Sequence, residues 1–297
     1  MQVLECVPNF SEGRDAETLE AIAASIRNVR GVKLLDYSAN VDHHRSVFTF
    51  MGEPAGVGEA ALAAALVAVE RIDLRRHHGE HPRIGAVDVV PFVPIRSLTM
   101  QEATGMAREF GHEFGRRAGV PVFFYGEAAT SAERRSLPFI RRGQYESLSR
   151  RLQQPAWRVD AGPQTFNAKV GATAVGARRP LIAFNVNLET SNVEIARAIA
   201  RGVRESGGGL PHLQAIGVSL RRSGLVQVAM NFTDYEKTPI SRGVEAVKTE
   251  AHRYGVRVSG TELIGLIPQK ALQDIVRYYL QLPDFSTERI IEANLLD

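Results

Sequence analysis

Hydrophobic positions in the first half of the chain recur with two periods, one typical of helices and one typical of strands. Leu19, Ile22, Ile26 and Val29 recur at spacings of three and four, which predicts an amphipathic helix over residues 15–29. The other elements predicted here are strands at 3–7, 32–37, 46–51 and 84–95 and an alanine-rich helix at 54–72. The predicted order is therefore βαββαβ.

The same order recurs in the second half of the chain. Strands are predicted at 181–188, 213–220, 225–232 and 256–263, and helices at 192–204, 241–254 and 271–280. A helix at 99–118 and a strand at 120–125 lie between the two repeats. Because βαββαβ is the ferredoxin-like order, we expect an α+β fold of two ferredoxin-like subdomains, residues 1–178 and 179–297. Their open sheet faces are expected to enclose a cleft, a common place for ligands.

Composition places the chain among globular proteins. Of its 297 residues 44% are hydrophobic, and the formal net charge is only +3. The arginine pairs are scattered, as on a solvated surface or around a small polyanion, and no basic block predicts nucleic-acid binding. No signal peptide or apolar run long enough for a membrane is found, so a cytoplasmic protein is expected. The single cysteine, Cys6, excludes an intrachain disulfide and is predicted to be a buried structural thiol.

Residues 77–85 form the most informative motif, because they hold three of the chain's eight histidines together with Glu80 and Arg83. Histidine both takes and gives protons near neutral pH. Gly79 and Pro82 oppose a helix, so the histidines are predicted to lie on a loop at the mouth of the following strand. Catalytic groups are often placed on such loops.

Two other interpretations of this motif stay open. His77 and His81 have the i,i+4 spacing of zinc ligands, and His43 and His44 could add ligands from another loop, although the glycine and proline oppose the necessary helix. A solvated turn that is rich in histidine is the third interpretation.

Residues 160–179 are rich in glycine, alanine and threonine and end in two arginines. One interpretation is a linker between the two halves. The other is a loop whose glycines let backbone amides approach a flat or anionic ligand. Both interpretations predict a boundary near residue 178.

Four segments in order, residues 5–13, 77–83, 119–129 and 171–178, resemble the formiminotransferase family over nearly the whole chain. The resemblance implies transfer of a formimino group from N-formimino-L-glutamate to N5 of tetrahydrofolate, in histidine degradation and one-carbon metabolism. It implies small-molecule substrates, a homodimer, and tetrahydrofolate as a co-substrate with no tightly bound cofactor. The cyclodeaminase part of some members has no counterpart here, so a stand-alone transferase is expected.

The resemblance also carries residue roles. His81 matches the catalytic acid/base of the family. The stretch that matches its folate-binding segment consists of Gly162, Pro163, Gln164, Thr165, Phe166, Asn167, Ala168, Lys169, Val170 and Gly171, with Arg178 as a flanking cation. Family members carry a proline, and sometimes a tryptophan, where residues 167–170 stand here.

The reaction calls for supporting groups as well. Both substrates carry glutamate carboxylates, and bidentate arginines bind such groups well. The candidate clamps are Arg45, Arg83 and Arg178. The candidate carboxylates that assist His81 are Asp36, Asp42 and Glu80, and His78 is a candidate for a supporting role.

Two functions from other classes compete with this interpretation. A metal-dependent amidohydrolase would use the histidine cluster, and metal analysis would distinguish it from the transferase. A non-catalytic regulatory protein would bind folate or an amino acid, but it would have no need of the histidine loop. The donor, formiminoglutamate, formiminoglycine or a formyl compound, is left open by the residues themselves.

Overall fold

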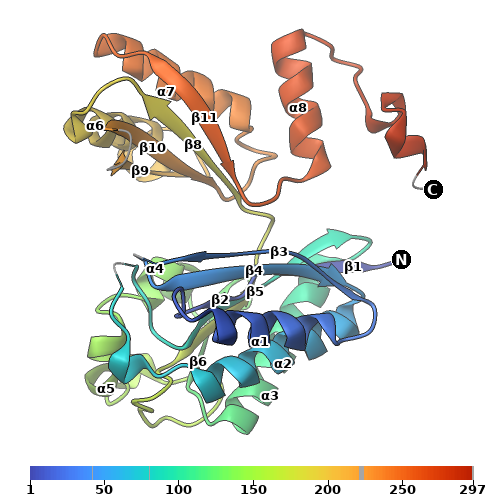
Figure 1. Cartoon of the computed structure of the whole chain (residues 1–297), viewed down its shortest axis with the longest axis vertical. Coiled ribbons are helices and arrows are strands. Elements are labelled where there is room, and N and C mark those ends of the chain that lie inside the picture. The colour runs from blue at the N-terminus through green and yellow to red at the C-terminus, as the bar shows by residue number, and fades with distance from the viewer. Residues whose placement is uncertain (42, 80, 221–223, 296–297) are drawn as a thin grey trace. The chain divides into compact units, whose positions relative to one another are not determined.

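The computed structural model describes residues 1–41, 43–79, 81–220 and 224–295 and divides into two compact units, Met1–Arg178 and Arg179–Asp297 (Figure 1). Each unit has its own sheet and its own hydrophobic core. The prediction of an α+β protein with two sheets is therefore confirmed. Asp42 and Glu80, both candidate carboxylates, lie outside the described residues.

The sheet of the first unit has seven strands in its described part. These are β1 (Val3–Cys6), β2 (Asn9–Phe10), β3 (Val32–Asn40), β4 (Arg45–Gly52), β5 (Val87–Arg96), β6 (Val122–Gly126) and β7 (Thr173–Ala177). Both β1 and β2 pair with β4 on one side and β5 on the other, so these two short strands share one position in the sheet. The strand order is therefore β3, β4, β1/β2, β5, β7 and β6. The last three strands run parallel, and the other pairings are antiparallel.

Three helices cover one face of this sheet: α1 (Ala16–Arg27), α2 (Pro54–Arg71) and α3 (Met100–Ala118) (Figure 1). Local chemistry sets their ends, because Asp15 caps α1, a Thr99–Glu102 capping box starts α3, and Gly119 ends α3 at φ +62°. The core beneath them is built mainly from alternate strand residues such as Phe48, Phe50 and Phe92. Cys6 is fully buried in this core, and burial raises its thiol pKa, which confirms the structural thiol.

The opposite face of the sheet has a second, smaller core over β5, β6 and β7. Residues 127–170 form it with short helical turns, including α4 (Leu137–Ile140) and α5 (Leu148–Arg151). Ile140 and Leu148 pack there against Val89 and Phe123. This layer brings the α4 end next to the start of β5, where the histidine loop enters the sheet.

The second unit has the order β8 (Ile182–Leu188), α6 (Val193–Val203), β9 (Leu213–Leu220), β10 (Leu225–Phe232), α7 (Ile240–Arg253) and β11 (Val258–Ile264), followed by α8 (Gln269–Leu280). Its sheet is antiparallel in the order β11, β8, β10, β9. Alternate residues of the central strands, among them Val186 and Val228, pack against α6 and α7. Within the described residues, no helix of either unit is long and apolar enough to cross a membrane.

Candidate active site

The histidine loop crosses close over the turn between β3 and β4, which explains its glycine. A Cβ on Gly79 would lie 2.3 Å from the carbonyl oxygen of His43, too close for any larger residue. The chain leaves a short helical turn, Leu74–Arg76, at His77, and the described residues from there to β5 form no helix. The prediction that the histidines lie on a loop is confirmed.

His77 holds this loop from inside the protein. Its ring is 3% exposed and stacks on the His44 ring with 4.1 Å between centroids. Its Nε2–H donates to the His44 carbonyl at 2.7 Å, and Arg83 Nε donates to its Nδ1 at 3.1 Å. We therefore assign the neutral tautomer, and burial lowers the pKa of His77 accordingly. Both ring nitrogens have protein partners, which leaves neither for a metal ion.

Arg83 supports the same loop. Its two terminal nitrogens donate to the Glu146 carboxylate at 2.7 and 3.1 Å, while its Nε holds His77. The guanidinium is 92% buried in side-chain terms and faces protein partners on every nitrogen. In the described structure Arg83 therefore supports the loop, and its predicted role as a clamp for substrate carboxylates stays a prediction.

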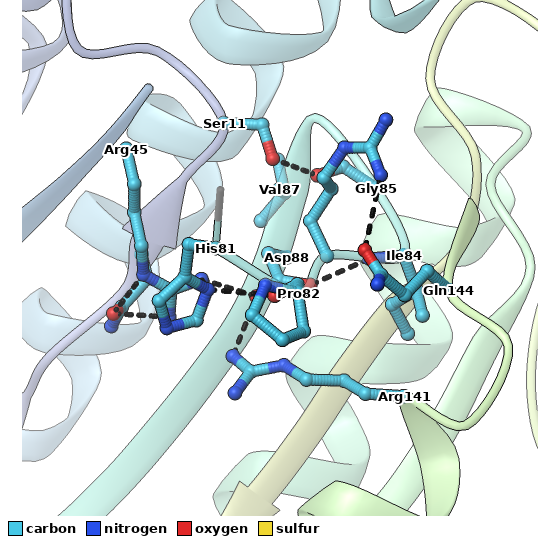
Figure 2. Close-up of polar contacts among 12 residues, drawn as sticks. Ser11, Arg45, His81, Pro82, Ile84, Gly85, Val87, Asp88, Arg141 and Gln144 are labelled. Atoms are coloured by element: carbon cyan, nitrogen blue, oxygen red, sulfur yellow. Dashed lines mark hydrogen bonds and ion pairs between the residues drawn. The ribbon is translucent and has the colours of Figure 1, made fainter. Parts of the chain in front are cut away.

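His81 faces a buried group of charged side chains (Figure 2). Its Nδ1 lies 2.7 Å from the carbonyl oxygen of Pro82 and 3.1 Å from a terminal nitrogen of Arg45. Two lone pairs at 2.7 Å would repel each other, so we assign the hydrogen to Nδ1, which donates to Pro82. Nε2 then carries the lone pair and is the nitrogen that can take a proton from a ligand.

Asp88 organises the charges around His81. Its Oδ2 accepts hydrogen bonds from Arg45 at 2.6 Å and from Arg141 at 2.5 Å, and its Oδ1 accepts the Ile84 N–H at 2.8 Å (Figure 2). Burial alone would raise the pKa of this fully buried carboxyl, but the Arg141 and Arg45 charges outweigh burial and lower it. Asp88 therefore stays ionised and fixes both guanidiniums.

Arg45 is held from its other edge by Asn9. Its Nε and second terminal nitrogen donate to Asn9 Oδ1 at 3.1 and 2.5 Å. Burial lowers the pKa of Arg45 to about 10, so its guanidinium remains charged at neutral pH. The result is a fixed positive charge beside the His81 ring.

The same environment determines the protonation state of His81. Burial, followed by the charges of Arg45 and Arg141, lowers the pKa of His81 to about 4. Because a depressed pKa disfavours the cation, the ring is neutral from about pH 5 upward. A neutral imidazole is the form that a general base requires.

We expect an NMR titration of His81 to reach its midpoint near pH 4 rather than near the ordinary value of 6.5. Arg141→Gln should raise the midpoint, because it removes one of the charges that oppose the imidazolium. Arg116→Gln, at an exposed arginine of α3, should leave it unchanged. Loss of the signal in His81→Gln identifies the resonance. A midpoint near 6.5 in the unsubstituted protein would contradict the assigned environment.

Asp36, the third candidate carboxylate, and His78 do not belong to the charged group around His81. Asp36 pairs with Thr49, four residues along β4 from Arg45, which is about 13 Å at the usual rise of a strand. The His78 side chain is exposed, and its carbonyl oxygen accepts a hydrogen bond from Arg14 at 3.0 Å. Among the described residues, the carboxylate next to the His81–Arg45 pair is Asp88.

Sequence reasoning missed Asp88, Arg141 and Asn9. One signal was present for Asp88, because it is a carboxylate inside an otherwise apolar strand, where an ionised group needs partners. Arg141 had no local signal: it lies 53 residues from Asp88 in sequence and belongs to one of many scattered arginine pairs.

The glycine-rich segment is not an extended linker. Glycine is required at two positions of it: Gly162 has φ +77° and Gly171 has φ +69°, and a Cβ would lie 2.2 Å from the carbonyl oxygen of Val120 or of Ile84, respectively. Gly171 bridges Gly85, and Ala172 N–H donates to Ile84 at 2.9 Å. The end of the segment therefore contacts residues that follow His81 by three and four positions, whereas its start lies next to β6.

Several polar groups of this segment are used within the first unit. Gln164 Nε2 donates to the Leu152 carbonyl at 2.8 Å, and Lys169 Nζ donates to the Glu70 carbonyl at 2.7 Å. Phe166 contacts the Tyr145 ring with 5.6 Å between centroids. These contacts shape the segment, and the predicted folate contacts of Gly162–Gly171 stay a prediction.

Arg178 lies at the end of β7 beside two buried groups. Burial raises the pKa of Glu5, and the Arg178 charge opposes that effect; burial likewise raises the pKa of Tyr125, which bonds Arg178. Arg178 N–H donates to the Phe92 carbonyl at 3.1 Å. Its role as a flanking cation for folate stays a prediction.

Comparison with known proteins gives a consistent result. A family model described as the N-terminal subdomain of the formiminotransferase domain matches residues 3–178, and a second, described as the formiminotransferase domain, matches residues 183–294. The chain is 45% identical to the glutamate formimidoyltransferase of Streptococcus pyogenes serotype M1, covering 99% of both chains.

Two further relatives extend the comparison. The glutamate formimidoyltransferase of Thermoplasma acidophilum is 43% identical, over 99% of this chain and 98% of that protein. The formimidoyltransferase-cyclodeaminase of Sus scrofa is 45% identical, over 94% of this chain and 53% of that protein.

Proposed function

The chain belongs to the formiminotransferase family, and from that premise we propose that it is a glutamate formimidoyltransferase. It transfers the formimino group of N-formimino-L-glutamate to N5 of tetrahydrofolate and releases L-glutamate. The observation in the structure that best supports this proposal is the state of the His81 ring. The ring is neutral, its Nδ1–H is bound to the Pro82 carbonyl, and it lies beside the charged group of Arg45, Asp88 and Arg141.

The reaction needs one proton moved twice. N5 of tetrahydrofolate attacks the formimino carbon and forms a tetrahedral intermediate, and His81 Nε2 takes the proton from N5. The bond between that carbon and the glutamate nitrogen then breaks, and the same Nε2 returns the proton to the departing nitrogen. General acid–base catalysis of this kind contributes about 10²–10⁴-fold to the rate.

The arginines beside His81 would link proton transfer to substrate binding. Arg45 and Arg141 disfavour the imidazolium in the unliganded protein. A substrate carboxylate close to them would offset their charge and make His81 a stronger base when the site is filled. The second source of catalysis is the holding of two substrates together, which requires no cofactor.

The finer architecture belongs to the same proposal. We propose that residues 1–178 and 179–297 are the two subdomains of the family, that each has the ferredoxin-like arrangement, and that Gly162–Gly171 contributes to folate binding. The strand orders and the matched segments of the two family models support this. The enclosed cleft, the homodimer and the cytoplasmic location stay predictions.

The proposal is tested by transfer from formiminoglutamate to tetrahydrofolate with the purified chain, with formiminoglycine and a formyl donor as alternative donors. We expect transfer from formiminoglutamate, and full activity after exhaustive chelation, because the proposed proton transfers use only His81. Activity that disappears with EDTA and returns with zinc would favour the metal-dependent amidohydrolase. Tight binding of folate without turnover would favour the regulatory protein.

A further inference from the structure

The charged group around His81 contains more positive than negative charge. Asp88 supplies one carboxylate, which accepts hydrogen bonds from the guanidiniums of both Arg45 and Arg141. His81 adds no charge, because its ring is neutral in the unliganded protein. The Asp88 side chain is fully buried and those of the two arginines are largely buried, so water screens the excess charge poorly. Among the described residues, this group is therefore one carboxylate short of neutrality.

Arg141 is the guanidinium of this group with donors to spare. Arg45 donates from all three of its nitrogens, to Asn9 and to Asp88. Arg141 Nη2 donates to Asp88 at 2.5 Å, but its Nε is buried without a partner, and no acceptor lies at Nη1 among the residues that the structure describes (Figure 2). Donors in such an environment normally find partners, and the side chain is 15% exposed, so a ligand can reach it. The spare donors point to an acceptor that a ligand supplies.

The backbone that carries Arg141 is held against the histidine loop. Tyr145 N–H donates to the Arg83 carbonyl at 2.9 Å, and Arg83 Nη1 donates to Gln144 Oε1 at 3.3 Å. Gln144 N–H donates to the Arg141 carbonyl at 2.8 Å, and Gln144 itself adopts φ +52° and ψ −165°, close to a region that essentially only glycine adopts. Such a conformation persists only where the surrounding contacts enforce it. The fold therefore fixes Arg141 relative to His81.

The distance from Arg141 to His81 suits an α-amino acid. Arg141 Nη2 lies 2.5 Å from Asp88 Oδ2, which lies 2.6 Å from Arg45 Nη1. That nitrogen lies 3.1 Å from His81 Nδ1, so Nη2 and the far ring nitrogen, Nε2, are at most about 10 Å apart. Two hydrogen bonds of about 2.8 Å and the roughly 3 Å between an α-nitrogen and its carboxylate oxygens span about 9 Å. A γ-carboxylate, two methylenes farther from the nitrogen, would fit only with its chain folded back.

We propose that Arg141 binds the α-carboxylate of the formimino donor, an inference that rests on the function proposed above. The departing nitrogen is bonded to the same carbon as this carboxylate, so the contact with Arg141 brings that nitrogen to His81 Nε2. The same contact neutralises the excess positive charge of the group. Arg141 is then the residue that requires the donor to be a formimino derivative of an α-amino acid with a free α-carboxylate.

Tetrahydrofolate also carries carboxylates, but they do not fit this position. They belong to its glutamyl tail, which the aminobenzoyl ring separates from N5. A tail carboxylate at Arg141 would hold N5 away from His81, whereas the reaction needs N5 within hydrogen-bond reach of Nε2. Of the two substrates, the donor is the one with a carboxylate next to the reacting atoms.

Replacing one donor carboxylate at a time by an amide tests the proposal in combination with Arg141→Gln. The three donors are N-formimino-L-glutamate, its α-amide and its γ-amide, and the acid/α-amide ratio compares their kcat/KM values. In the unsubstituted chain we expect a ratio of about 10 to 100, the loss of a charge-assisted contact. In Arg141→Gln the ratio should fall to at most about 3, whereas the effect of the γ-amide should be the same as in the unsubstituted chain.

The acid/α-amide ratio separates ligand binding from structural support. Arg141→Gln also removes a partner of Asp88 and a charge beside His81, but these losses act on every donor alike and cancel in the ratio. Arg142→Gln, at the next residue, is the matched control. The Arg142 side chain is exposed and its guanidinium carbon lies 5.2 Å from the centre of the Phe139 ring, so this variant should keep the full ratio.

A second variant protects the test against misfolding. Arg141→Lys keeps a positive charge beside Asp88, and circular dichroism with the melting temperature shows whether each variant is folded. A lysine ammonium is a single point charge, which cannot contact Asp88 and a ligand from two separate nitrogens. We therefore expect the acid/α-amide ratio of Arg141→Lys to be at least about threefold below that of the unsubstituted chain.

The outcomes separate this inference from the function itself. An unchanged acid/α-amide ratio in a folded Arg141 variant would overturn the inference while transfer activity remained intact. If the effect of the γ-amide disappeared instead, Arg141 would belong to the γ-carboxylate, which overturns the inference as well. If the chain transferred nothing, the proposed function would fail, and the same ratio of dissociation constants, from isothermal titration of each donor without tetrahydrofolate, would decide the inference. Failure of the acid to bind in that titration would overturn it too.

Discussion

Replacing His81 by glutamine is expected to lower kcat by about 10²–10⁴-fold while tetrahydrofolate binding and folding persist. Glutamine keeps a donor and an acceptor but cannot take the proton from N5 and return it to the departing nitrogen. Steady-state kinetics with both substrates saturating measures the effect. Far-ultraviolet circular dichroism and the melting temperature show whether the fold is intact.

His78→Ala is the matched control for this variant, because His78 precedes His81 by three residues on the same loop but has an exposed side chain. We expect a loss of about tenfold at most, the scale of a supporting interaction of about 1.4 kcal/mol. Equal inactivity of the two variants, or near-normal turnover in His81→Gln, would show that the proton-transfer role belongs to another group.

Asp88→Asn is expected to have the largest effect on stability, a loss of about 3–5 kcal/mol in the free energy of unfolding. The substitution removes the negative charge between Arg45 and Arg141 and leaves two buried guanidiniums facing each other. Urea unfolding followed by circular dichroism measures the loss. Transfer activity should fall in the folded fraction too, because Arg45 contacts His81.

The control for Asp88→Asn is a substitution in a surface ion pair with a similar distance between nitrogen and oxygen. Glu127 pairs with Arg135 at 2.5 Å, but both side chains are about half exposed. Glu127→Gln should cost at most about 1 kcal/mol, since water screens the lost charge. Similar losses in the two variants would mean that burial of the Asp88 group contributes little.

Much of the architecture could be predicted from the chain, because the information is local. The spacing of Leu19, Ile22 and Ile26 places one face of α1 in the core, and the alternation along β4 does the same for Phe48 and Phe50. Gly79 and Pro82 prevent helix over the histidine loop whatever packs against it. These properties follow from backbone geometry over a few residues, so neighbouring residues suffice to predict them.

The composition of the site depended on distant parts of the chain. The sequence placed His81 on a loop and proposed Arg45, but it offered Asp36, Asp42 and Glu80 as the carboxylate partner. Of these, Asp36 lies away from His81, and Asp42 and Glu80 lie outside the described residues; the described structure places Asp88 beside Arg45 and His81. Arg83, a proposed clamp, is bound by His77 and Glu146.

By itself, the sequence determined the two repeats of elements, the loop that carries His81 and the family to which the chain is similar. Only the tertiary structure decided which charges surround His81, because Arg141 reaches Asp88 across 53 residues and Arg45 reaches it across 43. Sheet pairing and the second core bring those residues together. A side chain's pKa depends on distance and burial in space, and these quantities exist only once the chain has folded.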